Sequence, residues 1–315
     1  CDVLLLLSQK PDHAAIQIFS PGAKLINVHR DNRHVGLNIP LDVGIIGYAD
    51  AVAEQLLEYI KSKVPPVRER GWVAELTGVK EAVGRMLDPA LERDEQPIAP
   101  SRLCGDIFKF LKSGEGRDLC YAADGGDSLA WPLTVCLLKG LEHPFVGRGA
   151  YMSYIGCIGS SWGFVRGLYE AVGKPILHSI GDGSFGQYVG ELFSFAKDKI
   201  PYVCLIFNDG NFGMIKAFSM KQAPDENHDL GQKICPADGE PYFHYETIAQ
   251  GWGGQGFCVT KPEDIIPTIK KAVEAAKDGT PAMVNVLLDC KEEYFSDGTV
   301  GLYHSLSSPK NIRYK

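Results

Sequence analysis

Segments with the apolar content of buried strands alternate along the chain with segments that have helical periodicity. The candidate strands are short apolar runs bounded by turn residues, at 2–8, 23–29, 118–126, 175–180, 201–208 and 281–289. The candidate helices lie between them, at 49–63, 101–113, 163–172, 186–198 and 262–278. This order predicts an α/β fold in which mainly parallel sheets are flanked by helices on both faces. Ligands of such sheets bind beyond the carboxyl ends of the strands.

The composition changes between residues 64 and 100, where the chain is rich in proline and charge. We interpret 64–100 as a linker with one helix around 73–87, between a first domain at 1–63 and a second at 101–315. Asp50 and Ser101 are candidate N-caps of the first helix in each domain. A chain of 315 residues is long enough for two cores. Because it starts in an apolar run, we expect further residues upstream.

The overall charge narrows the class of ligand. The net charge is −7 and the pI is about 5.7, without clustered Lys and Arg, which argues against a nucleic-acid partner and favours a small molecule. No apolar run approaches the roughly 20 residues of a membrane span, so we expect a cytoplasmic protein. The nine cysteines include no CxxC pair and are interpreted as reduced, buried thiols.

Two polar turns follow neighbouring candidate strands. Asp182 stands between Gly181 and Gly183 after the strand at 175–180, and Asn208 ends the strand at 201–208. Because one helix separates these strands, we expect their carboxyl ends to lie side by side. A carboxylate, an amide oxygen and a backbone carbonyl near a helix start suit Mg²⁺ with a phosphate. Singly, the GDG and NDG segments also fit a tight turn and a hairpin.

The stretch "GDGSFGQYVGELFSFAKDKIPYVCLIFNDGNFGMIK" (181–216) resembles the thiamine-diphosphate signature of the acetolactate synthase, pyruvate decarboxylase and benzaldehyde lyase superfamily. The resemblance implies that Asp182, the side chain of Asn208 and the carbonyl of Gly210 hold Mg²⁺, which holds the cofactor diphosphate. Phe207 departs from the pattern, since the family usually has a first Asn there. The cofactor contacts implied in this stretch are Gly181, Gly183, Ser184 and Phe185.

Two further segments resemble cofactor-binding parts of this family. In "YIGCIGSSWGF" (154–164), Ile158 fits the bulky residue that forces the bent cofactor conformation, and Gly156 and Ile158 would bond the aminopyrimidine. "DGGDSLA" (124–130) resembles a loop that touches the diphosphate, through Asp127 and Ser128. Each segment also fits an ordinary glycine-rich turn. His178, close to the site in sequence, is interpreted as a core histidine.

The segment 24–60 resembles the end of the family's central Rossmann-like domain, which carries FAD or ADP in some members. It contains no GxGxxG motif, so a nucleotide is possible but unsupported. The resemblance thus implies part of a central domain, a linker and a thiamine-diphosphate domain. The glutamate that activates the cofactor comes, in this family, from an N-terminal pyrimidine-binding domain that no segment matches. We therefore expect a fragment of a homodimer or homotetramer, or a partner chain that supplies that domain.

The resemblance implies thiamine-diphosphate- and Mg²⁺-dependent cleavage or formation of a C–C bond next to a carbonyl. Acetolactate-synthase-like decarboxylation or carboligation of a 2-oxo acid is the favoured activity. A lyase acting on a 2-hydroxyacyl-CoA or oxalyl-CoA-like substrate is the first alternative, and a non-catalytic cofactor-binding fold is the second. The long polar stretch 217–246 is the expected place for specificity, because loops of this length are often lids.

Overall fold

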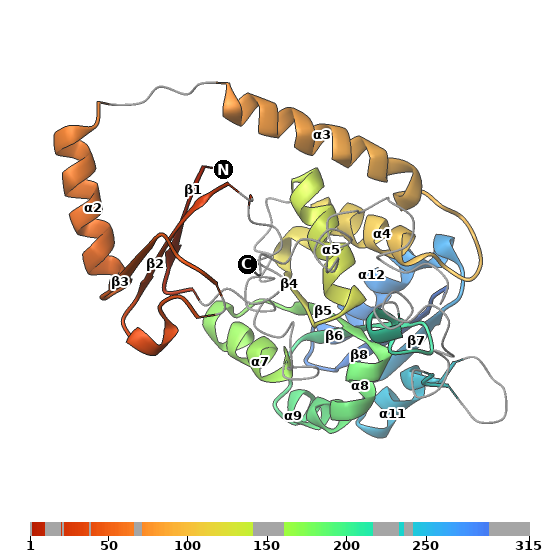
Figure 1. Cartoon of the computed structure of the whole chain (residues 1–315). Coiled ribbons are helices and arrows are strands. Elements are labelled where there is room, and N and C mark those ends of the chain that lie inside the picture. The colour runs from red at the N-terminus through yellow and green to blue at the C-terminus, as the bar shows by residue number, and fades with distance from the viewer. Residues whose placement is uncertain are drawn as a thin grey trace. The chain divides into compact units, whose positions relative to one another are not determined.

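The computed structural model describes residues 2–9, 20, 22–37, 39–65, 71–140, 161–216, 233–235 and 242–289 (Figure 1). Within the described residues, the chain divides into two compact units, one up to Glu75 and the other from Leu76 to Asp289. The division falls inside helix α3 (Trp72–Leu91), which occupies much of the expected linker and extends beyond the expected 73–87. The boundaries 1–63, 64–100 and 101–315 stay a prediction.

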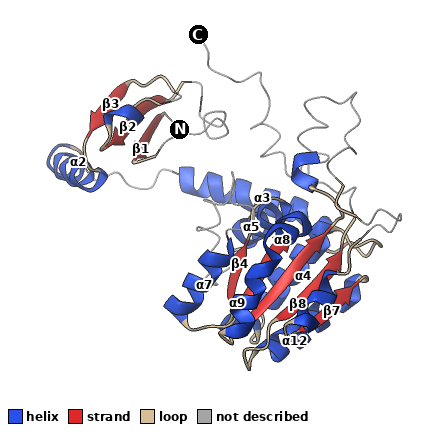
Figure 2. Ribbon diagram, turned by 90° about the horizontal axis from the view of Figure 1, so that it is seen from below, coloured by secondary structure: helices blue, strands red, loops and turns tan. Residues whose placement is uncertain are grey.

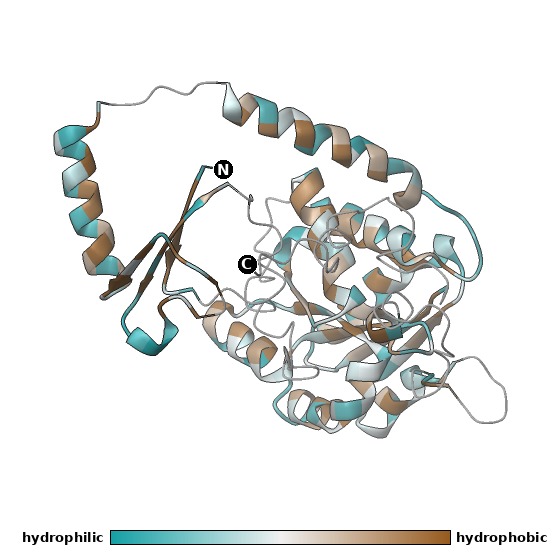
Figure 3. Cartoon of the chain, viewed as in Figure 1, coloured by the Kyte–Doolittle hydropathy of each residue, from teal (hydrophilic) through white to brown (hydrophobic). Residues whose placement is uncertain are grey.

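The first unit contains a parallel sheet of three strands in the order β1 (Val3–Leu7), β2 (Lys24–His29), β3 (Val43–Ile46). These strands are predominantly apolar (Figure 3). A 3₁₀ turn, η1 (Asn32–His34), and helix α2 (Ala49–Lys63) follow β2 and β3. Asp50 is not the N-cap: α2 starts at Ala49 after Tyr48, so Asp50 lies within the first turn. A carboxylate there still favours the helix, since it faces the positive end of its dipole.

The second unit is built on a parallel sheet of five strands in the order β4-β5-β6-β8-β7. In Figure 2, β4 lies at one side of this sheet and β8 and β7 lie at the other. The strands are β4 (Cys120–Ala123), β5 (Ile176–Gly181), β6 (Tyr202–Asn208), β7 (Gln255–Val259) and β8 (Ala282–Leu287). Every residue of β6 is buried, which explains why this strand reads as a continuous apolar run in the sequence.

Helices cover both faces of this sheet (Figure 1), which confirms the predicted fold class. One face carries α4 (Pro100–Lys112), α5 (Asp127–Lys139) and α12 (Ile265–Ala276). The other carries α7 (Ser161–Val172), α8 (Asp182–Tyr188), α9 (Leu192–Lys197) and α11 (Ile248–Gly251). The short 3₁₀ turns of this unit are η2 (Gly116–Asp118), η3 (Val189–Glu191), η4 (Tyr245–Thr247) and η5 (Pro262–Asp264).

Two helix starts differ from the sequence prediction. The helix expected at 186–198 begins at Asp182 and is divided into α8 and α9 by η3, so Asp182 is itself a helix residue after Gly181. Helix α4 is capped by Ala99, not by Ser101, whose hydroxyl donates to the carbonyl of Ala90 at 2.9 Å instead. Among the described residues, no helix has both the length and the apolar content needed to cross a bilayer.

Candidate functional site

A cavity of about 120 Å³ lies at the carboxyl edge of the five-stranded sheet. Three turns form most of it: the turn after β4, the start of α8 after β5, and the loop after β6. The lining residues that the sequence analysis proposed as cofactor or metal contacts are Asp127, Ser128, Gly181, Asp182, Gly183 and Ser184. The structure therefore brings two of the three proposed cofactor-binding segments together.

Asp182 is the buried anchor of this cavity. Its Oδ1 accepts from the N–H of Gly183 and its Oδ2 from the N–H of Gly210, both at 2.8 Å. The second bond ties the start of α8 to the loop after β6. Gly210 has a φ of +68°, a backbone conformation that favours glycine because a Cβ would strain it. The carboxylate is thus held in place by the backbone, independently of any ligand.

The carboxylates of Asp182 and Asp209 make this site favourable for a cation. The pKa of Asp182 is raised well above its ordinary value, first because burial removes hydration from the carboxylate and second because Asp209 repels its charge. Hydrogen bonds from the backbone N–H groups of Gly183, Gly210 and Asp182 itself lower the pKa without cancelling these effects. A divalent cation between carboxylates would remove both penalties.

Asp209 is a site residue that the sequence analysis missed. It lines the cavity, and its Oδ1 accepts from the N–H of Asn211 at 2.9 Å. A Cβ on Gly213 would collide with the carboxylate of Asp209 and lie 3.4 Å from Oδ2 of Asp127. The bare backbone at Gly213 therefore allows two carboxylates from different segments to approach one another. The sequence shows that Asp209 directly follows Asn208, but it does not show in which direction the side chain of Asp209 points.

Asn208 lies fully buried at the end of β6 and does not line the cavity itself. Its Nδ2 donates to the carbonyl of Phe243 and to Oδ1 of Asn285, both at 3.0 Å. Its own Oδ1 is inaccessible and has no hydrogen-bond partner in the part of the chain that the structure describes. An amide oxygen in this condition suits a cation ligand. The carbonyl of Gly210 accepts from the N–H of Ile234 at 2.7 Å, which leaves one lone pair for a second interaction.

The other predicted contacts differ in how the structure places them. Gly183 is packed against the loop after β6, since a Cβ there would lie 2.6 Å from Cε1 of Phe212. The ring of Phe185 is a core group, with its centroid 5.1 Å from that of Tyr245, and does not line the cavity. Ser128 bonds the carbonyl of Gly125 at 3.0 Å. Gly156 and Ile158 lie outside the described residues, so their proposed roles stay predictions.

His178 is a buried core histidine, as the sequence analysis proposed. Its Nδ1 lies 2.7 Å from the hydroxyl oxygen of Tyr202, and burial lowers the pKa of His178 from 6.5 to about 3. It therefore stays neutral at physiological pH and serves the core.

The side-chain and backbone groups at the cavity that could bind a metal do so through oxygen atoms. No group of three or more His, Cys, Asp or Glu side chains suited to a metal occurs among the described residues. A cation held here would need carboxylate, amide and carbonyl oxygens together with oxygens from a ligand. That is the coordination that Mg²⁺ adopts with substrate phosphates, so the residues present fit a Mg²⁺-diphosphate group.

Comparison with known proteins agrees with this chemistry. Residues 140–286 match the family "Thiamine pyrophosphate enzyme, C-terminal TPP binding domain". These residues therefore form a C-terminal TPP binding domain, and the match includes 181–216, which confirms the resemblance of that stretch.

Its curated relatives are distant. It is 24% identical, over 93% of its length, to a probable acetolactate synthase large subunit of Methanocaldococcus jannaschii. It is 26% identical, over 91%, to 2-hydroxyacyl-CoA lyase 2 of Danio rerio and 24% identical, over 87%, to glyoxylate carboligase of Escherichia coli O157:H7. The matched regions cover 47%, 44% and 45% of these relatives, so the chain spans about half of their length.

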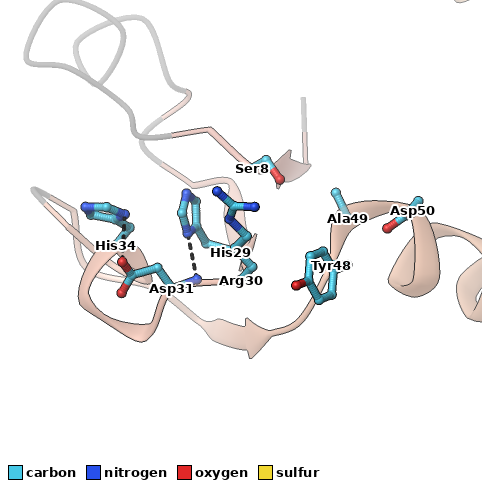
Figure 4. Close-up of a pocket in the computed structure, with 8 residues that line it drawn as sticks. All are labelled: Ser8, His29, Arg30, Asp31, His34, Tyr48, Ala49 and Asp50. Carbon is cyan, nitrogen blue, oxygen red and sulfur yellow. Dashed lines mark hydrogen bonds and ion pairs between the residues drawn. The ribbon is translucent and has the colours of Figure 1, made fainter.

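A second cavity, of about 610 Å³, lies in the first unit at the carboxyl ends of its strands (Figure 4). Its lining residues are Ser8, His29, Arg30, Asp31, His34, Tyr48, Ala49 and Asp50. Nδ1 of His29 accepts from the N–H of Asp31 at 3.0 Å, and hydrogen bonds from Arg33 hold the pKa of Asp31 well below its usual range. The Asp31 carboxylate is thus already engaged. FAD or ADP in this unit stays a prediction.

Proposed function

We propose that this chain binds thiamine diphosphate through Mg²⁺ at the carboxyl edge of its five-stranded sheet. The observation that carries the proposal is the pairing of Asp182, a buried carboxylate with a raised pKa, with the buried and unpartnered Oδ1 of Asn208 on the neighbouring strand. Among the described residues, Asp182 has backbone donors that do not offset the cost of burying its charge, and Oδ1 of Asn208 has no donor at all. A divalent cation supplies the missing counter-charge.

Each residue has a defined task in this site. Asp182 and Asn208 contribute side-chain oxygens to the cation, and Gly210 contributes its carbonyl. Asp209 adds a second carboxylate beside them. Ser184, in the first turn of α8 and lining the cavity, would offer its N–H to the diphosphate, while the N–H of Gly183 holds Asp182. When bound, the cofactor supplies a carbanion that attacks a carbonyl carbon and stores electrons after C–C cleavage.

For the reaction, we favour decarboxylation or carboligation of a 2-oxo acid. The names of the relatives from M. jannaschii and E. coli support it, while the lyase from D. rerio supports the alternative of 2-hydroxyacyl-CoA cleavage. A cofactor-binding fold without catalysis is the third candidate. The activating glutamate would come from a pyrimidine-binding domain, in a homodimer or homotetramer or from a separate chain. We expect the assembled protein to be cytoplasmic.

Thermal denaturation tests the cofactor site. The melting temperature of the wild type should rise with thiamine diphosphate and Mg²⁺ together, by an amount set by the ratio of free ligand to its dissociation constant. Asp182→Ala should abolish the rise. Asp198→Ala is the matched control, because it removes an exposed carboxylate bonded to Arg166 and should respond as the wild type does. Equal rises in wild type and Asp182→Ala would contradict the proposed site.

Product analysis separates the candidate reactions. The protein, assembled with a pyrimidine-binding domain, Mg²⁺ and the cofactor, would be given pyruvate or a 2-hydroxyacyl-CoA. Acetolactate from pyruvate supports the favoured activity, and cleavage of the acyl-CoA supports the lyase. Cofactor binding without either reaction favours the non-catalytic fold.

A further inference from the structure

A chain of hydrogen bonds runs behind the cavity from Glu246 to Asn208. Oε2 of Glu246, in η4, accepts from Nδ2 of Asn285 at 2.7 Å. Oδ1 of Asn285, in β8, accepts from Nδ2 of Asn208 at 3.0 Å. Both amides also donate to the carbonyl of Phe243, each at 3.0 Å. The two asparagines are wholly buried, so their polar atoms depend on these partners.

The donors and acceptors in this series of hydrogen bonds can be arranged in only one order. A carboxylate only accepts hydrogen bonds, whereas the two ends of an amide differ. Because Glu246 needs a donor, Nδ2 of Asn285 faces it and Oδ1 of Asn285 faces Asn208. Asn208 then turns its Nδ2 toward that oxygen. The carbonyl of Phe243 favours the same orientation, so it reinforces Glu246 without replacing it.

This arrangement determines the position of Oδ1 of Asn208, the last atom in the series of hydrogen bonds. With both N–H groups of Asn208 bonded, its Oδ1 is turned away from Asn285 and is left, within the described residues, without a hydrogen bond. This oxygen stands at the end of β6, on the strand next to β5, which leads directly into Asp182. A buried oxygen without a partner costs free energy, which engagement by a cation would recover.

The turn that carries Glu246 is fixed against the sheet. A Cβ on Gly256, in β7, would overlap the carbonyl oxygen of Glu246 and lie 2.6 Å from its carbonyl carbon. Only a residue without a side chain allows η4 to pack this closely on the strand. The Glu246 side chain therefore starts from a defined position, which is what an orienting role requires.

We infer that Glu246 is a positioning residue for the cation site: through Asn285 it sets the orientation in which Asn208 presents its oxygen to the metal. The inference rests on the proposed function, because the occupant is the Mg²⁺ that holds the diphosphate. Outer partners of metal ligands typically change metal affinity by about 10- to 100-fold when they are removed. Since Phe243 retains part of the orientation, we expect the lower end of that range.

Binding of Mn²⁺, the probe for Mg²⁺, tests this role without relying on activity. Free Mn²⁺ would be measured by electron paramagnetic resonance in the presence of thiamine diphosphate and the whole chain. Glu246→Ala should weaken Mn²⁺ binding about 10-fold. Glu246→Gln keeps an acceptor oxygen and should rescue most of the affinity. His244→Ala is the control, because this exposed residue contacts the outer oxygen of Glu246 at 2.9 Å and its loss leaves the inner chain intact.

The outcomes distinguish this inference from the proposed function. If the wild type does not bind Mn²⁺ with the cofactor, the proposed function fails and the role of Glu246 fails with it. If the wild type binds and Glu246→Ala binds equally well, only the role of Glu246 is overturned, even where the melting temperature of the cation-free protein falls. Asn285→Ser breaks the same chain at its middle and decides between these results if Glu246→Ala does not fold.

Discussion

Acid should destabilise the second unit through His178, by an amount that follows from the burial of this side chain. The ring lies in β5, fully inaccessible, with Nδ1 at 2.7 Å from the hydroxyl of Tyr202. Trp162 packs against it edge to face, at 5.7 Å between ring centroids. Burial lowers the pKa of His178 from 6.5 to about 3, because the protonated ring would lose its hydration in this environment.

The sign of the effect follows from the lowered pKa. Neutral His178 contributes its full stability above the unfolded pKa of 6.5, and this contribution is lost as pH falls from 6.5 toward 3. At pH 5 the unfolded chain binds a proton at this residue while the folded chain does not, which lowers the free energy of unfolding by about 2 kcal/mol relative to pH 7. Because pH 5 lies well above the folded pKa, this size depends mainly on the unfolded value.

Urea denaturation at pH 7 and pH 5 measures this loss. His178→Gln keeps a polar group beside Tyr202 and cannot titrate in this range. Carboxylates titrate in both proteins, so their contribution cancels in the difference. The wild type should lose about 2 kcal/mol more than the variant, with equal m values. The same loss in both proteins would refute the reasoning that His178 is buried in its neutral form.

Three further predictions concern packing and exposure. Phe185→Ala should lower the free energy of unfolding by about 3–5 kcal/mol in chemical denaturation, since the ring is fully buried, and a loss below about 1 kcal/mol would contradict this. Gly256→Ala should lower the free energy of unfolding by about 1–3 kcal/mol, because the new Cβ would force η4 away from β7. Unchanged stability would show that the backbone at Glu246 can move without cost. Iodoacetamide should label Cys258 slowly in the native protein, because this residue is exposed although partial burial raises its pKa to about 11, and it should not label the buried Cys204. Peptide mass spectrometry would show the difference, and labelling of Cys204 would mean that β6 opens.

The central strands could be predicted because their burial is written directly into the sequence. The runs at 175–180, 201–208 and 281–289 correspond to β5, β6 and β8, which have neighbours on both sides in the sheet. Strand β7 was missed. It is the edge strand next to β8, it contains Gly256, and four of its five residues are exposed or half-buried. A half-covered strand of this length has no continuous apolar run to recognise.

The start of α8 could not be read from local propensity. Residues 182–188 contain two glycines and a serine, a composition that disfavours helix and favours a turn. Tertiary bonds decide the conformation, because the carboxylate of Asp182 reaches the N–H of Gly210, 28 residues later. The loop after β6 therefore stabilises a helix start that the sequence around Asp182 does not favour by itself.

The two neighbours Asn208 and Asp209 show where reasoning from sequence ends at this site. Their spacing from Asp182 predicts that they lie near it, because parallel strands end at one edge. Which of the two faces the cavity is decided by distant residues: Phe243 and Asn285, 35 and 77 positions away, take both N–H groups of Asn208 and fix its amide. Asp209 is turned into the cavity beside Asp127 by the backbone around Gly213. A motif can therefore predict the elements of a cation site, while the orientation of each oxygen depends on contacts that only the fold creates.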